Sequence, residues 1–242
     1  MKISAVIPAH NEEGNVEDMT KILFSNLGNQ IIEVIIVNDC SNDNTGRILK
    51  NLQKKHSRLK VVTRRKDGGV GNAIRAGLGA VSKQATHVLM LDCDFTKNKE
   101  DIKTVVAAHT KADGILGSRY MKGGILKNYP VGKKIGNRAF HLLCQILLGL
   151  KQRDVTNNFR FYKKEIIDKI LPYLESSGFS INSEIGLFPI IMGYKIKEIP
   201  VSWVERSHGM GLSDFKVFRV APGYVKVFLR ALRYKHLGFP QT

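Results

Sequence analysis

The chain has 242 residues, of which 38 are Lys or Arg and 21 are Asp or Glu, so its formal net charge is +17. Its 43% hydrophobic and 24% charged residues are typical of a globular protein and exclude the disordered and fibrous classes. The length suits one large α/β domain or two small ones. The charge predicts an anionic partner: nucleic acid, phosphorylated small molecules or an anionic membrane surface.

The same sequence limits the compartment. No stretch reaches the roughly 18–20 consecutive apolar residues of a membrane-spanning helix. The opening segment MKISAVIPAHNEE has no long apolar core, so it predicts a strand rather than a signal peptide. Cys40, Cys93 and Cys144 lie far apart and fit neither a disulfide framework nor a zinc site. We therefore expect a soluble protein of a reducing, intracellular compartment.

Strand and helix patterns alternate in the first half of the chain. Apolar runs predict strands at residues 2–8, 31–39, 59–63, 86–92 and 114–120. Apolar residues at helical spacing predict helices at residues 15–27, 44–56 and 71–83. This order is typical of an α/β fold with a parallel sheet covered by helices on both faces. Ligands of such sheets bind at the carboxyl ends of the strands.

The second half is less regular. We expect a helix at 131–150, a strand at 155–162, a helix at 181–192 that Pro189 kinks or shortens, and edge strands within 194–204. A Gly-rich loop at 207–213 precedes a basic amphipathic segment, 215–236, which Pro222 and Gly223 are expected to break. Without a repeat or a linker, residues 1–212 are predicted to form one domain. Residues 213–242 are predicted to pack on it or on a membrane surface.

Polar clusters follow the first two predicted strands. VIPAHNE ends in an Asn-Glu pair, for which Asn11 as the cap of the next helix is the simpler interpretation. In VNDCSNDNT, the Asp39 carboxylate can accept hydrogen bonds from a nucleotide base, while Ser41 or Asp43 caps the following helix.

The segment KDGGVGNAIRAG places three glycines before a predicted helix. The start of a helix is a ready anion site, and Lys66 and Arg75 would suit a diphosphate. The dinucleotide motif G-x-G-x-x-G nevertheless fails, because Ile74 stands at its last glycine position.

The segment LDCDF follows a buried strand and carries the clearest chemistry. Asp92 and Asp94 repel each other unless a cation lies between them. Hard oxygen ligands select Mg²⁺ or Mn²⁺, which would bridge a diphosphate. Further along, Arg119 follows another strand, and Glu184 stands in a predicted first helical turn, where the helix dipole favours an acid.

Taken in order, VIPAHNE, VNDCSND, the GGVGNA loop, LDCDF, GSR, D-x-T-x-x-F-R and GYKIKEIPVSW…R resemble the inverting family 2 glycosyltransferases of the GT-A fold. Among these, the chain is similar to dolichyl-phosphate mannose synthases and related polyprenyl-phosphate glycosyltransferases. The resemblance spans about residues 3–206. The ordered set is specific, although no single motif is.

The resemblance implies roles for particular residues. It assigns the nucleotide sugar to Pro8, His10, Asn11, Glu12, Asp39, Lys66, Gly69, Asp92 and Cys93. It assigns the metal, Mg²⁺ or Mn²⁺, to Asp92 and Asp94, and catalysis to Asp94, Arg119 and Arg206. It assigns the acceptor phosphate to Arg119, Lys133 and Asn137.

The chain also departs from the family pattern. Asn38 stands where the family commonly has Asp, and Lys133 where it has Arg, which loses bidentate phosphate geometry. The loop RSHGMGLSD ends in Asp214 where the family has Lys, and Lys216 and His208 are candidates to replace that cation. These departures weaken the prediction of mannose more than that of a glycosyltransferase.

The function that the resemblance implies is transfer of a sugar, mannose from GDP-mannose in the first instance, to a polyprenyl or dolichyl phosphate. A phosphate monoester is already largely anionic at pH 7, so it needs no general base. The alternative is a UDP-sugar-dependent transferase (glucose or GlcNAc) acting on a polyprenyl phosphate or on a hydroxyl acceptor of a cell-surface glycan. A hydroxyl acceptor would need a base such as Glu184. A nucleic-acid-binding module is disfavoured, because the basic residues are not interleaved with aromatic ones.

A lipid acceptor implies a cytoplasmic protein that lies peripherally on the cytosolic face of a membrane and contacts its anionic surface. Residues 139–150 and 215–234 are predicted to provide this contact. In the second segment, the apolar face comprises Tyr224, Val225, Phe228, Ala231 and Leu232. The alternative for this segment is an ordinary surface helix packed on the core.

Overall fold

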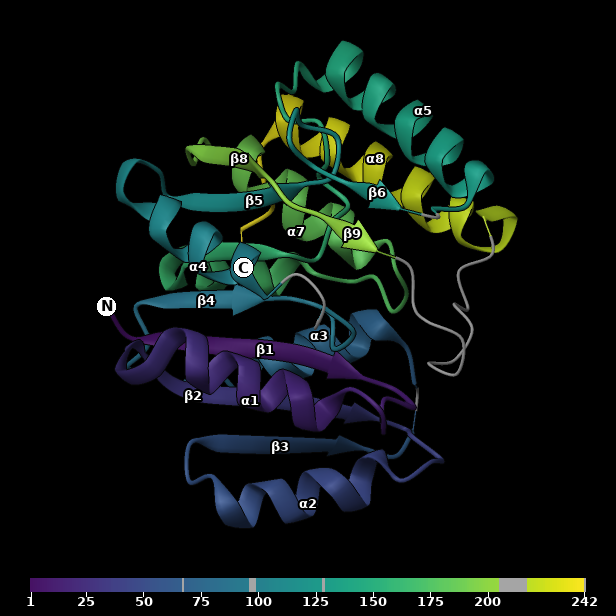
Figure 1. Ribbon diagram of the computed structural model, residues 1–242. Helices are drawn as coiled ribbons and strands as arrows, with labels where there is room; N and C mark the ends of the chain where they lie inside the picture. The colour runs from purple at the N-terminus through teal and green to yellow at the C-terminus, as the bar shows by residue number, and fades with distance from the viewer. Residues whose placement is uncertain (67, 96–98, 128, 205–216, 242) are drawn as a thin grey trace.

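The computed structural model describes residues 1–66, 68–95, 99–127, 129–204 and 217–241. A seven-stranded sheet forms its centre, in the order β3-β2-β1-β4-β7-β5-β8 (Figure 1). The strands are β1 (Ile3–Ala9), β2 (Ile31–Asp39), β3 (Leu59–Arg64), β4 (His87–Met90), β5 (Gly114–Ser118), β7 (Arg160–Lys163) and β8 (Ile196–Pro200). β7 is antiparallel to β4 and β5, and the other pairs of this sheet are parallel. The predicted mostly parallel sheet is therefore confirmed.

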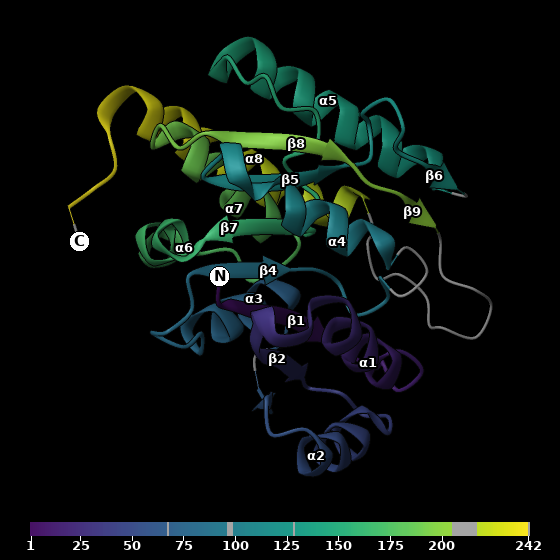
Figure 2. The same ribbon diagram turned by 60° about the vertical axis from the view of Figure 1, so that its left-hand side comes forward.

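Helices cover both faces of this sheet (Figures 1 and 2). They are α1 (Val16–Leu27), α2 (Thr45–Lys55), α3 (Val70–Gly79), α4 (Glu100–Ala107), α5 (Val131–Leu148), α6 (Lys164–Ile170), α7 (Ile181–Ile191) and α8 (Val217–Leu237). Successive residues of a strand point to opposite faces. In β1, Ile3 and Ile7 accordingly point to one face and join an apolar cluster with residues of α1, α2 and α4. Val6 points to the other face and joins a second cluster with residues of α3, α6, α7 and α8.

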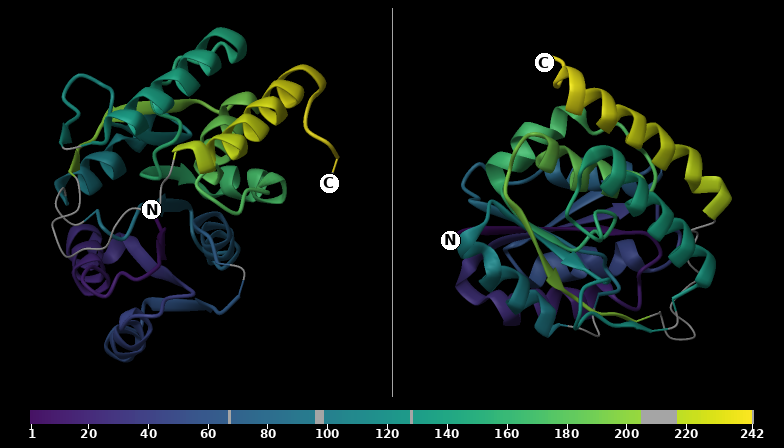
Figure 3. Two further views of the ribbon diagram at one scale, coloured as in Figure 1. Left: turned by 90° about the vertical axis from the view of Figure 1, so that its right-hand side faces the viewer. Right: turned by 90° about the horizontal axis from the view of Figure 1, so that it is seen from above.

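A small second sheet pairs β6 (Leu126–Lys127) with β9 (Trp203–Val204). Among the described residues, no helix is long and apolar enough to span a bilayer. α8 contacts both α7 and α5, so the C-terminal helix packs on the rest of the molecule (Figure 3).

Several predicted elements were wrong in detail. α4 and α6 were not predicted, and the strand predicted from residue 155 begins only at Arg160. The break predicted at Pro222 is absent, because α8 continues to Leu237; Pro189 lies within α7, which continues to Ile191. α7 persists because every residue from Ile181 to Pro189 is buried, and α8 is anchored by buried Ala231. Tertiary packing thus outweighs the lost proline hydrogen bond.

Candidate active site

The loops that follow β1 and β2 bind to each other at the carboxyl edge of the sheet. The Nδ1 of His10 lies 2.6 Å from the carbonyl oxygen of Asp39. The backbone N–H of Asn11 donates to Ser41 Oγ at 3.1 Å, and Asn42 N–H donates to Asn11 Oδ1 at 2.9 Å. The two clusters that the sequence assigned to the nucleotide sugar are therefore brought together.

The backbone at this place adopts a rare conformation. Asn11 has a φ of 52° and Cys40 a φ of 55°, in the left-handed region that few non-glycine residues occupy. Asn11 is not a helix cap, as the simpler interpretation had it, because α1 begins at Val16. Asp43 does support the start of α2, since its Oδ1 accepts the N–H of Thr45 at 2.9 Å. Strained backbone of this kind clusters at ligand sites.

Two residues assigned to the nucleotide sugar lie in the protein interior or the sheet itself. Pro8 is part of β1, opposite Val37 of β2. Glu12 is buried; its N–H donates to Thr45 Oγ1 at 2.8 Å, and its carboxylate accepts a hydrogen bond from Asn15 at 2.6 Å. Both residues shape the loop.

Asp39 ends β2 with a carboxylate that is 5% exposed and bound by the protein. It forms an ion pair with Arg64 and accepts the backbone N–H of Gly69 at 2.7 Å. Asp39 thus fixes the glycine loop that leads into α3, a role that the sequence did not predict. Lys66 is exposed beside this loop.

The prediction that the start of α3 binds an anion was wrong. The N–H groups of Gly71 and Asn72 donate to the carbonyl oxygen of Ser177, at 2.8 and 3.4 Å. A Cβ on Gly71 would lie 2.2 Å from the carbonyl oxygen of Ser176. The glycines therefore admit another backbone segment where a phosphate was expected.

Arg75 has partners within the protein. Its guanidinium donates to the carbonyl oxygen of Leu174 at 2.9 Å and contacts the side chain of Asn72. The sequence could not show that the segment after Leu174 closes the start of α3, because the two are about a hundred residues apart in the chain.

The two carboxylates of LDCDF lie just beyond β4, as expected. Cys93 between them is buried, whereas Asp92 is exposed and Asp94 half-buried. The Nδ2 of the buried Asn158 donates to Asp92 Oδ1 at 2.8 Å. Sequence reasoning missed Asn158, although the antiparallel register Met90↔Arg160, continued by two residues, places it opposite Asp92.

The donor set of this turn fits a divalent cation. Within the described ranges, no group of three His, Cys, Asp or Glu side chains could hold a metal ion. Mg²⁺ is commonly bound by one or two carboxylates, with waters and substrate phosphates as its other ligands. Asp92 and Asp94 supply such a pair of hard oxygen donors at the edge of the sheet.

Arg119, which follows β5, is held by a buried carboxylate. Its Nε lies 2.7 Å from Asp154 Oδ2 and its Nη2 2.8 Å from Asp154 Oδ1. Burial favours the neutral forms of both groups, but their mutual attraction outweighs it. The pKa of Arg119 is raised and the pKa of Asp154 is lowered, so both stay charged.

A hydroxyl joins Arg119 to the predicted acceptor residues on α5. Thr156 Oγ1 accepts hydrogen bonds from Arg119 Nη2 at 3.3 Å and from Asn137 Nδ2 at 2.5 Å. Lys133 lies one turn before Asn137, on the same side of the helix. Arg119 and Asn137 therefore meet at Thr156, with Arg119 held by Asp154. Asp154 and Thr156 belong to the D-x-T-x-x-F-R motif, which by itself assigns them no role.

Glu184 is fully buried in α7 and has structural partners. Its Oε2 accepts the N–H groups of Glu175 and Ser176, at 3.0 and 3.2 Å, and its Oε1 accepts Arg230 of α8 at 2.5 Å. Burial raises the pKa of Glu184, against the effect of these hydrogen bonds and of Arg230. Its role extends beyond that of a first-turn acid, because it ties α7 to a loop and to α8.

The remaining predicted catalytic residue, Arg206, lies outside the described residues. The same holds for the residues considered in its loop, namely His208, Asp214 and Lys216.

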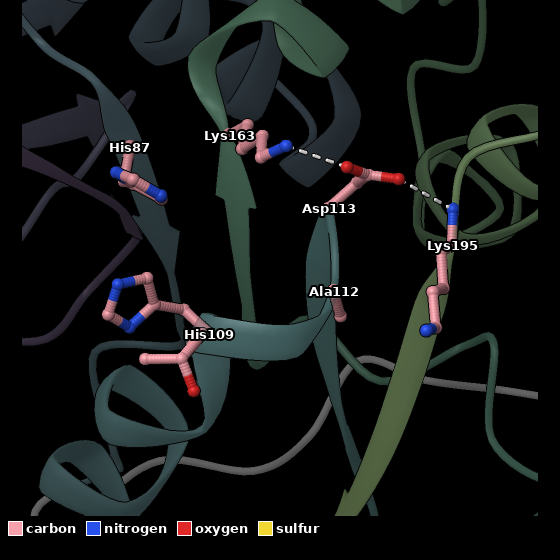
Figure 4. A pocket seen from close by; sticks show the side chains of 7 residues that line it. His87, His109, Ala112, Asp113, Lys163 and Lys195 are labelled. Atoms are coloured by element: carbon pink, nitrogen blue, oxygen red, sulfur yellow. Dashed lines mark hydrogen bonds and ion pairs between the residues drawn. The ribbon is translucent and has the colours of Figure 1, made fainter.

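A cavity of about 510 Å³ lies at the opposite, amino-terminal edge of β4 and β5 (Figure 4). His87, His109 and Lys195 line it with Asp113, which binds Lys163 at 2.7 Å. Burial, assisted by nearby positive charge, lowers the pKa of His87 to about 4. Of the described residues that line this cavity, none belongs to the predicted site.

Comparison with known proteins identifies the family. The model of glycosyl transferase family 2 matches residues 4–171, more than half of the chain. The chain belongs to glycosyl transferase family 2. It is therefore a glycosyltransferase.

Two relatives cover most of this glycosyltransferase. An undecaprenyl-phosphate mannosyltransferase of Micrococcus luteus is 29% identical over 213 residues, which are 86% of each chain. A polyprenol monophosphomannose synthase of Mycolicibacterium smegmatis is 27% identical over 209 residues, 85% of this chain and 78% of that protein.

Solved structures confirm the GT-A fold. Glucosyl-3-phosphoglycerate synthase of Mycobacterium tuberculosis, in complex with UDP, aligns with a TM-score of 0.65 at 18% identity. The alignment covers 100% of this glycosyltransferase and 82% of that chain. The same enzyme in complex with Mn²⁺, UDP and glucosyl-3-phosphoglycerate aligns with a TM-score of 0.64, over 100% and 81% of the two chains, also at 18% identity.

Proposed function

We propose that this glycosyltransferase moves a mannosyl residue from GDP-mannose to a polyprenyl phosphate. One structural observation carries the proposal: the loop before β7 contacts both halves of the predicted site. Asn158 of this loop binds Asp92 on the donor side. Asp154 and Thr156 of the same loop bind Arg119 on the acceptor side. A single loop thus links donor and acceptor groups at the carboxyl edge of one sheet, where ligands of such sheets bind.

The chemistry follows from these groups. An oxygen of the acceptor phosphate attacks the anomeric carbon, and the bond from that carbon to the donor diphosphate breaks, with inversion. Because the acceptor is already anionic at neutral pH, no side chain has to remove a proton. Arg119 and Lys133 orient the acceptor phosphate. Asp92 and Asp94 would hold Mg²⁺ or Mn²⁺, which neutralises charge on the leaving diphosphate.

The geometry of Glu184 supports a phosphate acceptor over a hydroxyl. A general base must reach the proton that it removes. Both Glu184 oxygens already accept hydrogen bonds inside the protein, and the side chain is fully buried. Glu184, the candidate base for a hydroxyl acceptor, therefore holds α7, α8 and a loop together.

The names of the two relatives support mannose and a polyprenyl phosphate for this chain. The same proposal includes residues 1–212 as the catalytic domain, with Arg206 acting on the donor. Residues 213–242 would form a basic C-terminal segment. It also includes a cytosolic location, peripheral on an anionic membrane surface.

A metal-dependent transfer assay tests the proposal. The wild type should transfer labelled mannose from GDP-mannose to a polyprenyl phosphate with Mg²⁺ or Mn²⁺, and chelation should abolish the transfer. The variant Asp94→Ala should be inactive but folded. In parallel, GDP-mannose, UDP-glucose and UDP-GlcNAc should be compared by thermal shift, since a ligand of the folded state raises its melting temperature. If only the UDP-sugars raise the melting temperature, the donor is a UDP-sugar and not GDP-mannose.

A further inference from the structure

α5 exposes an apolar row to solvent. Val131, Ile135, Leu142 and Ile146 are each between 55% and 71% exposed. At about 100° per residue, they fall within roughly 60° of one another around the helix axis. The buried residues of α5, which include Cys144, lie on the other side of the helix.

The neighbouring helix α8 also exposes apolar side chains. Val225 and Leu229 are 56% and 58% exposed, while Val227 and Ala231 face the core. Of the eleven large apolar side chains that are exposed in the described part of the chain, nine lie on α5 and α8. We name the α5–α8 face by six of them: Val131, Ile135, Leu142, Ile146, Val225 and Leu229. Monomeric soluble proteins rarely gather apolar residues in this way, and such a patch marks an interaction site.

The α5–α8 face corrects part of the sequence prediction. The segment expected to contact the membrane through Tyr224, Phe228 and Ala231 turns these residues inward. Phe140 of α5 packs against the ring of Tyr224 at 5.4 Å between centroids. Of the predicted apolar face of α8, Val225 is exposed and the other four residues are buried or half-buried.

Both helices are also uniformly cationic. Neither contains an Asp or Glu, and together they carry eight Lys or Arg: Lys133, Lys134, Arg138, Arg219, Lys226, Arg230, Arg233 and Lys235. Arg230 is used internally by Glu184. Lys134, Lys226 and Arg233 are exposed. An apolar row flanked by cations matches the interface of an anionic bilayer, where each nearby cation contributes about 1 kcal/mol.

The inner side of α5 faces the acceptor cluster, and its outer side faces solvent. Asn137 faces inward and binds Thr156 of the acceptor cluster. Ile135 and Leu142 face outward. A membrane that touches the outer side of α5 would therefore lie within one helix diameter, about 10–12 Å, of the acceptor cluster.

We propose that the α5–α8 face docks on the surface of an anionic lipid bilayer and so delivers a membrane-embedded acceptor phosphate to the inner side of α5. The first part rests on exposure and charge alone; the second rests on the proposed function. A second copy of this chain would match the apolar row, but two such faces would bring like charges together.

Vesicle co-sedimentation of the full chain tests the docking. The wild type should bind vesicles of phosphatidylcholine with phosphatidylglycerol, bind phosphatidylcholine alone weakly, and dissociate at high salt. The variant Leu142→Gln/Ile146→Gln should bind about tenfold or more weakly, because two apolar side chains no longer enter the interface. Both residues are exposed, so the variant should keep the melting temperature of the wild type.

A matched pair of charge variants separates docking from general attraction. Lys134→Glu/Lys226→Glu should lose binding to anionic vesicles. Lys50→Glu/Lys54→Glu changes the net charge equally, but on exposed positions of α2, at the other end of the molecule from α5 (Figure 1). This control should bind as the wild type does. Equal loss in both variants, or no binding by the wild type, would overturn the proposal.

Two further readouts separate the remaining outcomes. Transfer to a short-chain, water-soluble polyprenyl phosphate should be unchanged in Leu142→Gln/Ile146→Gln, whereas transfer to a long-chain acceptor in vesicles should fall with binding. Vesicle binding without transfer to any polyprenyl phosphate would refute the proposed function and leave the docking intact. A wild-type dimer that this variant converts to a monomer, without vesicle binding, would show instead an interface between copies.

Discussion

The Arg119–Asp154 pair provides a quantitative test of how the acceptor side is built. Asp154 is fully buried and receives three N–H groups of Arg119: the backbone N–H at 3.0 Å and two from the side chain. Replacing Asp154 by Asn leaves the Arg119 guanidinium without its counter-charge in a site where it is only 10% exposed. Removing one partner of such a buried pair costs about 3–5 kcal/mol.

For a domain of this size, 1 kcal/mol shifts the melting temperature by about 2–4 °C, so Asp154→Asn should melt roughly 10 °C below the wild type. Urea unfolding gives the free energy directly. The double variant Arg119→Met/Asp154→Leu should regain much of the loss, because no unpaired charge stays buried. Transfer activity should be lost in both, since Arg119 is either misplaced or absent. An Asp154→Asn variant as stable as the wild type, or a double variant less stable than Asp154→Asn, would refute this account of the pair.

Three further predictions follow from other contacts. Glu184→Gln should lower stability by about 1–3 kcal/mol in urea, since Arg230 loses its buried charged partner and keeps only the more exposed Glu175. The variant should keep most of the transfer activity, and a loss of activity without a loss of stability would point to a catalytic base. Asn158→Ala should raise the metal concentration for half-maximal transfer about tenfold or more, because Asp92 loses the hydrogen bond from Asn158. An unchanged metal titration would show that Asn158 does not orient Asp92 for metal binding. For His87, the pKa of about 4 lies below the ordinary histidine value of 6.5, so the unfolded state binds more protons between these values. Stability should therefore fall as the pH drops from about 6.5 towards 4, and His87→Phe should flatten this dependence in urea titrations; an equally steep curve would show that other groups cause it.

The sequence predicted the strands and their polar ends well, because buried strands are continuous apolar runs and their order fixes the edge at which they end. It placed Asp92 and Asp94 beyond β4 for this reason. The resemblance placed Arg119 and Asn137 in one cluster, and Thr156 links them in the structure.

Contacts between segments far apart in the chain could not be predicted. Gly71 resembled part of a phosphate loop, but the backbone of Ser177 occupies the start of α3. Asn158 became visible as a partner of Asp92 only through the antiparallel register of β7. Pro222 marked a helix break that the packing of α8 on α7 overrides. In each case, tertiary contacts decided what local propensity left open.

The choice of acceptor is the central claim, and one comparison tests it directly. With GDP-mannose and Mg²⁺ or Mn²⁺ present, the enzyme is offered a polyprenyl phosphate and, separately, the matching polyprenol without the phosphate. The account predicts a mannosylated product with the polyprenyl phosphate and none with the polyprenol. The predicted site orients an anion, and the candidate base Glu184 is buried and hydrogen-bonded within the protein. Transfer to the polyprenol, or to a sugar hydroxyl, in preference to the phosphate would contradict it.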